Sequence, residues 1–430
     1  MRIVADLHVH SKYARATSKD NDIDGLARGA KVKGIDVMAG GDFTHPQYFN
    51  EIKMKLSDSE DGSGLYLHDG VRFILSSEIS LIYSSKRGTL ETGHGTRDTG
   101  HALRMHHLML APSLEIVSQI NDELGKRGNL KSDGRPILGV SSPELAEVLF
   151  SISKDIMLIP AHAYTPWFSV FGSMSGVDTI EQAFEDKADK IFAIESGLSS
   201  DPAMSWMISR LDKYSIVSNS DAHSLDNLGR EANVFDLKEV SYAAIHKTIK
   251  TRDGFVKTYE FYPEEGKYHY DGHRACGINW SPWESMKHKN MCPVCRKEVT
   301  IGVLHRVAEL ADRKLGFVPK GAVPFQYIVP LRTIISKTIR KGERTGAVSK
   351  EYDRIVRYFG NEFNVFESDE TRIQLATTPE IAESIMKVKK GDVRWVPGYD
   401  GVFGELILDD KNMPRGPSIS DKKQTSLGDY

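Results

Sequence analysis

The chain opens with "MRIVADLHVH", in which His8 and His10 follow a short apolar run. In a β-strand, side chains two residues apart point to the same face, so these two imidazoles project together. Two imidazoles on one face can chelate a single metal ion. The pattern also fits two solvated histidines at a strand end, because one H-x-H motif is too short to be specific. The rest of the chain must decide between these interpretations.

Several later apolar runs also end in side chains that can bind metal. Imidazoles favour Zn, Mn, Fe and Ni, whereas a carboxylate can bridge two cations. Two ions about 3.5–4 Å apart can activate water and neutralise the leaving oxygen of a phosphodiester. The residues in question are Asp42, Glu78, His162, Glu195, Asp221 and His223.

Short apolar runs alternate with amphipathic stretches up to about residue 260. This alternation is typical of repeated βα units and predicts an α/β fold with a parallel sheet. In a (β/α) barrel the C-terminal ends of the strands converge on one rim, so residues far apart in the sequence would share a cavity there.

Six segments carry the candidate ligands, in the order "DLHVH", "GGDFTHP", "LSSEIS", "MHHLML", "IPAHAY" and "SNSDAH". Their order and contexts resemble the polymerase-and-histidinol-phosphatase (PHP) family. The resemblance covers roughly the first 250 residues. It implies a distorted (β/α)7 barrel that holds two or three divalent metals (Zn, Mn or Mg) and hydrolyses phosphoesters.

The same resemblance implies a role for each candidate ligand. Glu78 would bridge two metals, and the third site lacks a histidine that many members carry, so Lys19 or Asp20 is an alternative contributor there. One metal would be held by His8, His10 and Asp221, the second by His107 and His162, and a third by His45 and His223. The expected catalytic residues are His8, His10, Glu78, His107, His162, Asp221 and His223.

Two assignments stay open on the residues alone. On the strand "HHLML" only one of His106 and His107 can face the cavity, and the choice of His107 comes from the resemblance because periodicity does not make it. Asp42 and Glu195 are either direct ligands or partners that orient a liganding histidine.

A second cluster of ligands lies near residue 285, where "HRAC" is followed by "CPVC". Two such knuckles offer four ligands to tetrahedral zinc and leave no position open for water, so we expect one structural zinc. A redox pair is the alternative for C-x-x-C, but no thioredoxin-like strand and helix surround it. The expected ligands are His273, Cys276, Cys292 and Cys295, with His269, His288 and His305 as alternatives to the histidine.

The composition limits the class of protein. With 430 residues, the chain is long enough for two or three domains. A formal charge of -3 argues against a uniformly basic nucleic-acid binder but leaves room for a local basic groove. Three cysteines indicate a reducing compartment, and neither a long apolar run nor a signal-peptide pattern is present. We therefore expect a cytoplasmic, nucleoid-associated protein without a membrane partner.

The downstream half extends the resemblance. The order of barrel, "YHYDGHRAC…CPVC", "TIGVLHRVAELADR" and "PGYDGVFGE" is similar to the endonuclease Q family of DNA-repair nucleases. This resemblance implies hydrolysis of the phosphodiester 5′ to uracil, hypoxanthine, xanthine or an abasic site in damaged double- or single-stranded DNA, leaving 3′-hydroxyl and 5′-phosphate ends. The expected domains are a barrel over 1–262, a zinc-binding module over 263–315, a small α+β domain for DNA and lesion recognition over 316–410, and a disordered tail over 411–430.

Each candidate DNA-binding residue also has an ordinary structural alternative. A local basic stretch could neutralise phosphates, although it fits a solvated helix face equally well. A base pocket would need aromatic or apolar walls and a close backbone approach, but a turn rich in Gly and Pro is more often only a turn. The candidates are Arg332, Lys337 and Arg340, followed by Lys341 and Arg344, for phosphates, and Trp167, Tyr399 and Asp400 for the lesion.

The last residues, "QTSLGDY", place Gln424, Leu427 and Tyr430 at positions one, four and seven. This spacing resembles the box with which repair proteins bind the sliding clamp (PCNA), although such boxes usually carry two adjacent aromatic residues.

Two rival functions remain. A small-molecule phosphatase of the histidinol-phosphatase kind would need only the barrel, and a DNA-binding scaffold would need no intact metal motifs.

Overall fold

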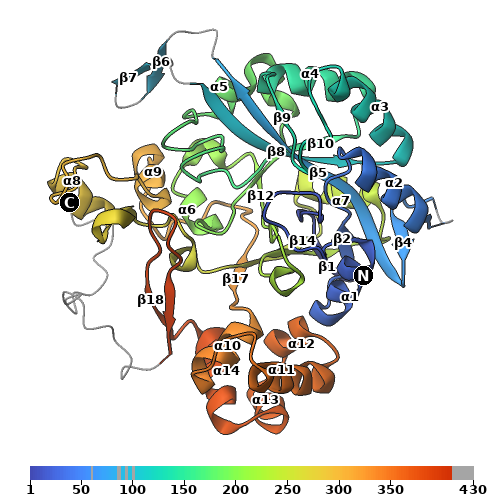
Figure 1. Cartoon of the computed structure of the whole chain (residues 1–430), viewed down its shortest axis with the longest axis vertical. Coiled ribbons are helices and arrows are strands. Elements are labelled where there is room, and N and C mark those ends of the chain that lie inside the picture. Colours follow the sequence, from blue (N-terminus) through green and yellow to red (C-terminus); the bar gives the residue numbers. More distant parts are fainter. Residues whose placement is uncertain (60–61, 85–88, 93–94, 99–101, 409–430) are drawn as a thin grey trace.

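A computed structural model describes residues 1–59, 62–84, 89–92, 95–98 and 102–408. Its largest sheet places segments far apart in the sequence side by side (Figure 1). Three short strands extend it, because β3 (Ser57–Asp58) pairs with β4 (Tyr66–His68), and β4 and β9 (Ile137–Leu138) pair with β5. The strands of the main path are, in spatial order, β10 (Met157–Pro160), β8 (Leu103–Ala111), β5 (Val71–Tyr83), β2 (Val37–Ala39), β1 (Arg2–Asp6), β13 (Ala232–Asp236), β14 (Phe255–Glu260) and β17 (Phe325–Tyr327).

The sheet is only partly parallel, so the expectation of a wholly parallel sheet was wrong. Strand β1 is parallel to β2 and β2 to β5, but β8 runs antiparallel to both β5 and β10. The described residues between β5 and β8 include the hairpin of β6 (Thr89–Thr92) and β7 (Gly95–Asp98) and no helix. A parallel neighbour requires a crossover connection, usually helical, so a chain that returns through a hairpin pairs antiparallel.

A second sheet, with two parallel strands, lies between the two ends of the large sheet. It consists of β11 (Ala193–Glu195) and β12 (Ser215–Val217). The N–H of Ala163, after β10, donates to the carbonyl of Glu195 at 2.9 Å, and a β-bridge joins Val9 to Ala222. The ends of β1, β10, β11 and β12 therefore meet on one side of the sheet.

Helix α1 (Ile23–Lys33) illustrates how the sequence sets the elements that flank these strands. The Asp22 side chain accepts a hydrogen bond from the N–H of Gly25, which satisfies a free donor at the start of the helix. The helix ends at Gly34, whose φ of 89° is the left-handed conformation that glycine adopts without strain. Its apolar residues recur at helical spacing and are buried against the sheet.

The other helices before residue 252 cover the sheet or fill its connections. Figure 1 shows α4, α3 and α2 following one another around the upper right of the molecule. They are α2 (Pro46–Lys55), α3 (Leu114–Gly125), α4 (Ser142–Ile152), α5 (Ile180–Phe184), α6 (Pro202–Ser205) and α7 (Tyr242–Thr251). Among the described helices, none combines the length and the apolar character that a membrane crossing requires.

The segment with the cysteines forms a small unit of its own. Strands β15 (Asp271–His273) and β16 (Ile278–Trp280) pair antiparallel, followed by α8 (Pro282–Lys287) and α9 (Val303–Leu310). Backbone hydrogen bonds from Gly398 to Glu264 and from Gly404 to Glu265 join it to the last described loop.

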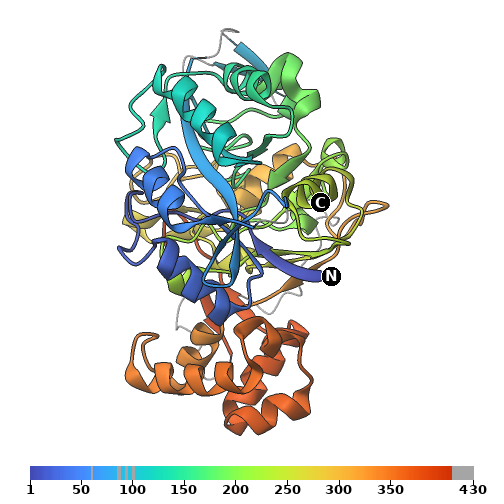
Figure 2. The same cartoon turned by 90° about the vertical axis from the view of Figure 1, so that its right-hand side faces the viewer.

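A group of helices follows and gathers at one end of the molecule (Figures 1 and 2). A buried ion pair fixes this group to the rest of the chain, because Lys33 Nζ at the end of α1 lies 2.7 Å from Glu362 Oε2. Its elements are α10 (Leu331–Ile339), α11 (Gly346–Phe359), α12 (Glu362–Glu367), α13 (Glu370–Ala376), α14 (Pro379–Lys390) and the hairpin of β18 (Arg394–Val396) and β19 (Glu405–Ile407). Over 316–408 the described elements are mainly helices with the short strands β17, β18 and β19, and the domain bounds of 316–410 stay a prediction.

Candidate metal centre

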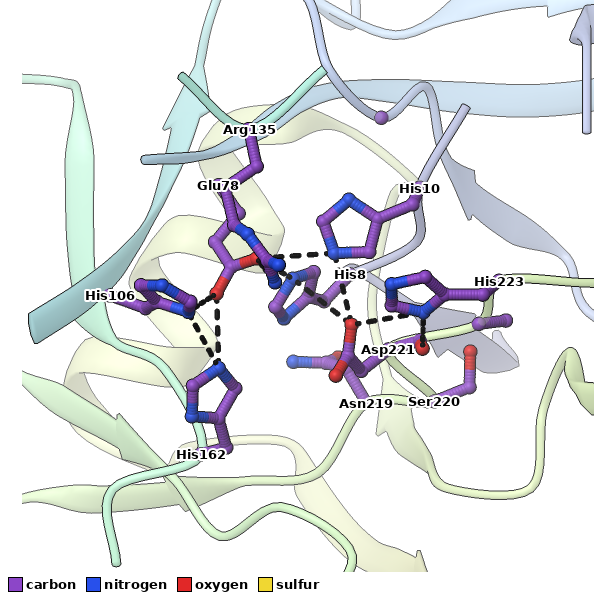
Figure 3. A network of polar contacts seen from close by, with 12 residues as sticks. His8, His10, Glu78, His106, Arg135, His162, Asn219, Ser220, Asp221 and His223 are labelled. Atoms are coloured by element: carbon purple, nitrogen blue, oxygen red, sulfur yellow. Dashed lines mark hydrogen bonds and ion pairs between the residues drawn. The ribbon is translucent and has the colours of Figure 1, made fainter. Parts of the chain in front are cut away.

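Four side chains converge at the C-terminal end of β1 (Figure 3). The ligand atoms of His8, His10, Glu78 and Asp221 all lie within 4.8 Å of one another. His10 Nε2 is 3.1 Å from Glu78 Oε2 and 3.0 Å from Asp221 Oδ1. Strand β1 ends at Asp6, but the extended backbone continues through the bridge at Val9, which keeps both histidines on one face. These four residues are the first ligand group.

A second ligand group consists of Glu78, His106 and His162. His106 Nδ1 lies 2.7 Å from Glu78 Oε1, and His162 Nε2 lies 3.0 Å from the same oxygen. Glu78 thus directs Oε2 toward the first group and Oε1 toward the second, as Figure 3 shows. This is the geometry expected of a bridging carboxylate.

The choice of His107 as a ligand was wrong, and strand register explains why. Glu78 on β5 lies opposite Leu108 on β8, so Glu78 shares a face with Leu108 and His106. His107 lies opposite Ile79 and points to the other face. Its Nε2 is 2.8 Å from Ser142 Oγ, and its ring packs 5.0 Å from that of Phe184. Burial there lowers the pKa of His107 to about 3.

Three atoms of the first ligand group are buried but make no hydrogen bond of acceptable geometry: His8 Nε2, His10 Nε2 and Asp221 Oδ1. Buried polar atoms without partners are rare and costly, so convergent ones indicate a missing ligand. Two imidazole nitrogens and a carboxylate oxygen, beside Glu78 Oε2, form a donor set that suits a divalent transition metal. The residues therefore fit a metal ion.

The carboxylates of Asp42 and Glu195 orient these histidines and do not join either ligand group. His8 Nδ1–H donates to Glu195 at 3.0 Å, and His10 Nδ1–H donates to Asp42 Oδ1 at 3.0 Å. Each bond leaves Nε2 free to bind metal. Glu195 also accepts from the side-chain amide of Asn219 and the backbone N–H of His162. Of the two roles that the sequence left open for these residues, this geometry favours that of a partner that orients a histidine.

The electrostatics keep the bridging carboxylate ionised. Burial alone would raise the pKa of Glu78, but the charges of His106 and Arg135 outweigh burial and hold this pKa well below its usual range. Burial likewise opposes the charged form of His8, yet the Glu195 carboxylate beside it raises the pKa of that imidazole well above its usual value. The carboxylates of Glu78 and Asp221 therefore stay ionised, and their charge would stabilise a metal cation bound between them.

Three residues of the site have a strained backbone. Asp42, His162 and Asp221 have φ values of 37°, 31° and 46°, in the left-handed region that non-glycine residues rarely adopt. Each follows a strand, β2, β10 and β12 respectively. Such conformations cost about 1–3 kcal/mol each and cluster at functional sites.

Arg135 is part of the site, although no pattern in the sequence points to it. Its guanidinium donates to Glu78 Oε2 at 2.9 Å, and this carboxylate is the first reason why the pKa of Arg135 is raised further. Arg135 follows a Gly in "SDGRP" and ends no apolar run. Only the folded chain brings it to Glu78.

The predicted ligands of a third metal are not gathered into a group of three among the described residues. His223 lies next to the first ligand group, with its ring 4.5 Å from that of His10 and its Nδ1 2.9 Å from the carbonyl of Asp221. His45 instead stacks on Tyr13 at 4.3 Å, and its Nδ1 is buried without a hydrogen-bond partner. The alternatives Lys19 and Asp20 are exposed.

The expected zinc ligands His273, Cys276, Cys292 and Cys295 form the third group that could hold a metal. Cys295 Sγ lies 3.7 Å from His273 Nδ1. The alternative histidines are engaged elsewhere: His269 with the carbonyl of Ser199, His288 stacked on Trp280, and His305 with Asp271. One nitrogen and three sulfur donors fit a tetrahedral structural zinc.

The residues predicted to contact the lesion lie where three loops meet. Trp167 packs edge-on against Tyr268 at 5.9 Å. Asp400 accepts hydrogen bonds from the N–H of Arg274 and the hydroxyl of Thr300, so its carboxylate holds the loop in place. Tyr399 forms a β-bridge with Tyr270.

The predicted phosphate contacts Arg332 and Lys337 lie on α10, and Arg340, Lys341 and Arg344 follow its end. Arg332 lies 3.5 Å from Asp226 and stacks over Tyr352, and Lys337 Nζ lies 2.9 Å from Glu405. Arg340 ends the helix with a φ of 54°. Binding of DNA by these residues stays a prediction, and the tail residues Gln424, Leu427 and Tyr430 lie outside the described residues.

Comparison with known proteins extends over nearly the whole chain. The family model described as the MJ0043 C-terminal domain matches residues 330–392, the segment of α10–α14. The uncharacterized protein MJ0043 of Methanocaldococcus jannaschii is 33% identical over 252 residues, which are 57% of this chain and 31% of that protein, so the match spans about a third of its length. The uncharacterized protein YqxK of Bacillus subtilis is 26% identical over 427 residues, 94% of this chain and 99% of YqxK.

Two solved structures share both fold and length with this chain. The crystal structure of the lesion-specific endonuclease PfuEndoQ from Pyrococcus furiosus is 31% identical with a TM-score of 0.81, covering 94% of this chain and 95% of that one. Endonuclease Q in complex with a 27-mer duplex substrate with an abasic lesion at the active site is 30% identical with a TM-score of 0.83, covering 96% and 98%. Since both likenesses extend over almost the full length of each partner, the resemblance read from the sequence is confirmed, and the chain belongs to the endonuclease Q family.

Proposed function

We propose that this protein is a metal-dependent DNA-repair endonuclease. It hydrolyses the phosphodiester 5′ to uracil, hypoxanthine, xanthine or an abasic site and leaves 3′-hydroxyl and 5′-phosphate ends. The observation that carries the proposal is the pair of ligand groups that share Glu78. The related structures, a lesion-specific endonuclease and a complex with an abasic duplex, support the choice of substrate.

The first ligand group would hold one divalent ion and the second group another, with Zn, Mn or Mg as candidates. When bound, such ions lower the pKa of water and neutralise charge on the phosphoryl group. In the reaction, the oxygen of water forms a bond to phosphorus and the P–O3′ bond breaks. The departing 3′ oxygen takes up a proton, which balances the proton that water loses.

The residues of the chain prepare the site for this step. Glu195 and Asp42 hold His8 and His10 in the tautomer with Nε2 free. The barrel of PHP type that we propose brings these residues to one rim, although β8 runs against the parallel direction. The cysteine unit would hold one structural zinc, supplying folding free energy to a segment with little core of its own.

Partner binding is proposed from the sequence. Arg332 and Lys337 on α10 and Arg340 after its end would contact DNA phosphates, and the loops with Trp167, Tyr399 and Asp400 would contact the lesion. Gln424, Leu427 and Tyr430 would bind a sliding clamp. Deleting residues 424–430 should abolish clamp capture in a pull-down and leave nicking of free oligonucleotides intact, whereas undiminished capture would refute this role.

A nicking assay tests the central proposal. Duplexes with one uracil, one inosine, one abasic site or no lesion are incubated with Mg or Mn, beside a phosphomonoester. We expect lesion-dependent nicking that is lost in Glu78→Gln and kept in Glu123→Gln, because Glu123 is an exposed residue of α3 that pairs with Lys126 and Arg127. Turnover of the monoester alone would support a phosphatase instead, and no turnover would support a scaffold.

A further inference from the structure

Among the described residues, Arg135 places its guanidinium against a side chain of the ligand groups, whereas Arg230 contacts the backbone carbonyls of Ser220 and Asp221. The Arg135 side chain is 27% exposed, whereas those of Glu78, His8 and His10 are fully buried. The guanidinium therefore reaches from the buried carboxylate to the open edge of the site. Its single recorded hydrogen bond, to Glu78 Oε2, leaves other N–H donors for a further acceptor.

The loop that carries Arg135 is fixed on both sides. The N–H of Gly134 donates to the carbonyl of Tyr13 at 3.0 Å, and the N–H of Ser80 on β5 donates to the carbonyl of Pro136 at 3.1 Å. The N–H of Arg135 itself donates to Asp133 Oδ1 at 3.0 Å. The backbone position of Arg135 is thus set by the same strand that carries Glu78.

Gly134 shows how closely this loop approaches the ligand groups. A Cβ at this position would lie 2.4 Å from Asp42 Oδ2 and 2.8 Å from the backbone nitrogen of Ala14. No other residue fits without displacing Asp42, the carboxylate that orients His10. The loop therefore brings Arg135 close to the ligand groups, and its close approach leaves no room for a side chain at position 134.

Electrostatics indicate what the guanidinium contacts in the working enzyme. Glu78 Oε2 faces His8 and His10 as well as Arg135, so a cation in the first ligand group would share that oxygen with the arginine. A cation that draws on the same oxygen leaves less of the Glu78 charge to neutralise the guanidinium, so the remaining N–H donors of Arg135 favour a further anion. The anion that the proposed reaction brings is the phosphodiester, whose oxygens match the planar fork of arginine.

We infer that Arg135 binds a non-bridging oxygen of the scissile phosphate and stabilises the charge that develops there. This inference rests on the proposed function, since it names the phosphate contact of the same site. Removing one such donor typically lowers the rate about 100-fold or more. Lysine keeps the charge without the fork, so it should restore only part of the rate.

The test compares Arg135→Ala, Arg135→Lys and the control Arg127→Ala. Arg127 has the same exposed fraction, 27%, and also pairs with a glutamate, Glu123. We expect Arg135→Ala to lower single-turnover nicking about 100-fold or more and to weaken binding of a lesion duplex in EDTA about tenfold, with wild-type metal content. The lysine variant should fall between the two, and Arg127→Ala should match the wild type.

Wild-type nicking by Arg135→Ala would overturn the inference. So would a loss of nicking with a parallel loss of bound metal and unchanged DNA binding, because Arg135 would then act only by positioning Glu78. If the wild-type protein nicks no duplex, the proposed function fails, and the binding measurement in EDTA still decides whether Arg135 contacts phosphate.

Discussion

Glu195 offers a sharp test of how the site is built, because it belongs to neither ligand group and yet orients His8, a member of the first group. Its carboxylate accepts from His8 Nδ1 at 3.0 Å, from Asn219 Nδ2 at 2.8 Å and from the N–H of His162 at 2.9 Å. Glu195→Gln keeps the size and one acceptor oxygen. It turns an amide N–H₂ toward one of these donors and removes the charge that favours the present tautomer of His8.

The expected magnitude follows from this geometry. Loss of a carboxylate that orients a liganding histidine typically weakens metal binding about 10- to 100-fold. This corresponds to about 1.4–2.8 kcal/mol of binding free energy. Glu195→Ala is less useful, because it would leave three donors without an acceptor at a cost of about 1–3 kcal/mol each.

A chelator competition measures the apparent Kd for Mn²⁺ in the wild type, Glu195→Gln and Glu123→Gln. A positioning role also predicts that raising the metal concentration restores most of the nicking rate of Glu195→Gln. An apparent Kd within twofold of the wild type would refute the reasoning, as would a nicking rate that saturating metal fails to restore.

Three further predictions concern neighbouring features. His106→Ala should lower metal content and nicking, whereas His107→Ala should lower the melting temperature and leave metal content unchanged; elemental analysis and thermal melts separate the two, and the reverse pattern would restore His107 as a ligand. Cys292→Ser should remove one zinc per chain and leave the metals near Glu78 in place, so unchanged zinc stoichiometry would contradict the assignment. Burial raises the pKa of Glu265 to about 8, so the folded state holds a proton there that the unfolded chain releases above about pH 4.5, and stability falls as pH rises between these values. Melting curves of Glu265→Gln should therefore lose less stability than the wild type from pH 5 to 8, and parallel curves would refute this.

The candidate ligands at strand ends, which the structure gathers into the two ligand groups, were accessible from the sequence because local rules place them. Alternation puts His8 and His10 on one face, and an apolar run followed by a polar side chain marks Asp221 and His162. The zinc ligands were accessible for a similar reason, since each pair lies within one short knuckle. In both cases residues that are close together in the sequence are also close together in the folded chain.

The features that the sequence did not predict are those that depend on which strands pair and in which register. Alternation says that one of His106 and His107 faces the cavity, but only the register of β8 against β5 says which one. The reversed direction of β8 goes with a connection whose described residues contain a hairpin and no helix, and no composition signal marks that connection. Arg135 reaches Glu78 through a loop 57 residues further along the chain, a distance at which no periodic pattern operates.

The buried pair of Lys33 and Glu362 limits how freely the segment of α10–α14 can be exchanged between proteins. Glu362 also accepts from the N–H of Leu331 and the hydroxyl of Tyr352, both within that segment, but its countercharge among the described residues is Lys33 of α1. A chimaera that grafts residues 330–392 onto an unrelated chain would bury a carboxylate without its countercharge, a defect worth about 3–5 kcal/mol. Recombination of this segment would therefore succeed only in hosts that offer a lysine or arginine at the matching position, or after the glutamate itself has been replaced.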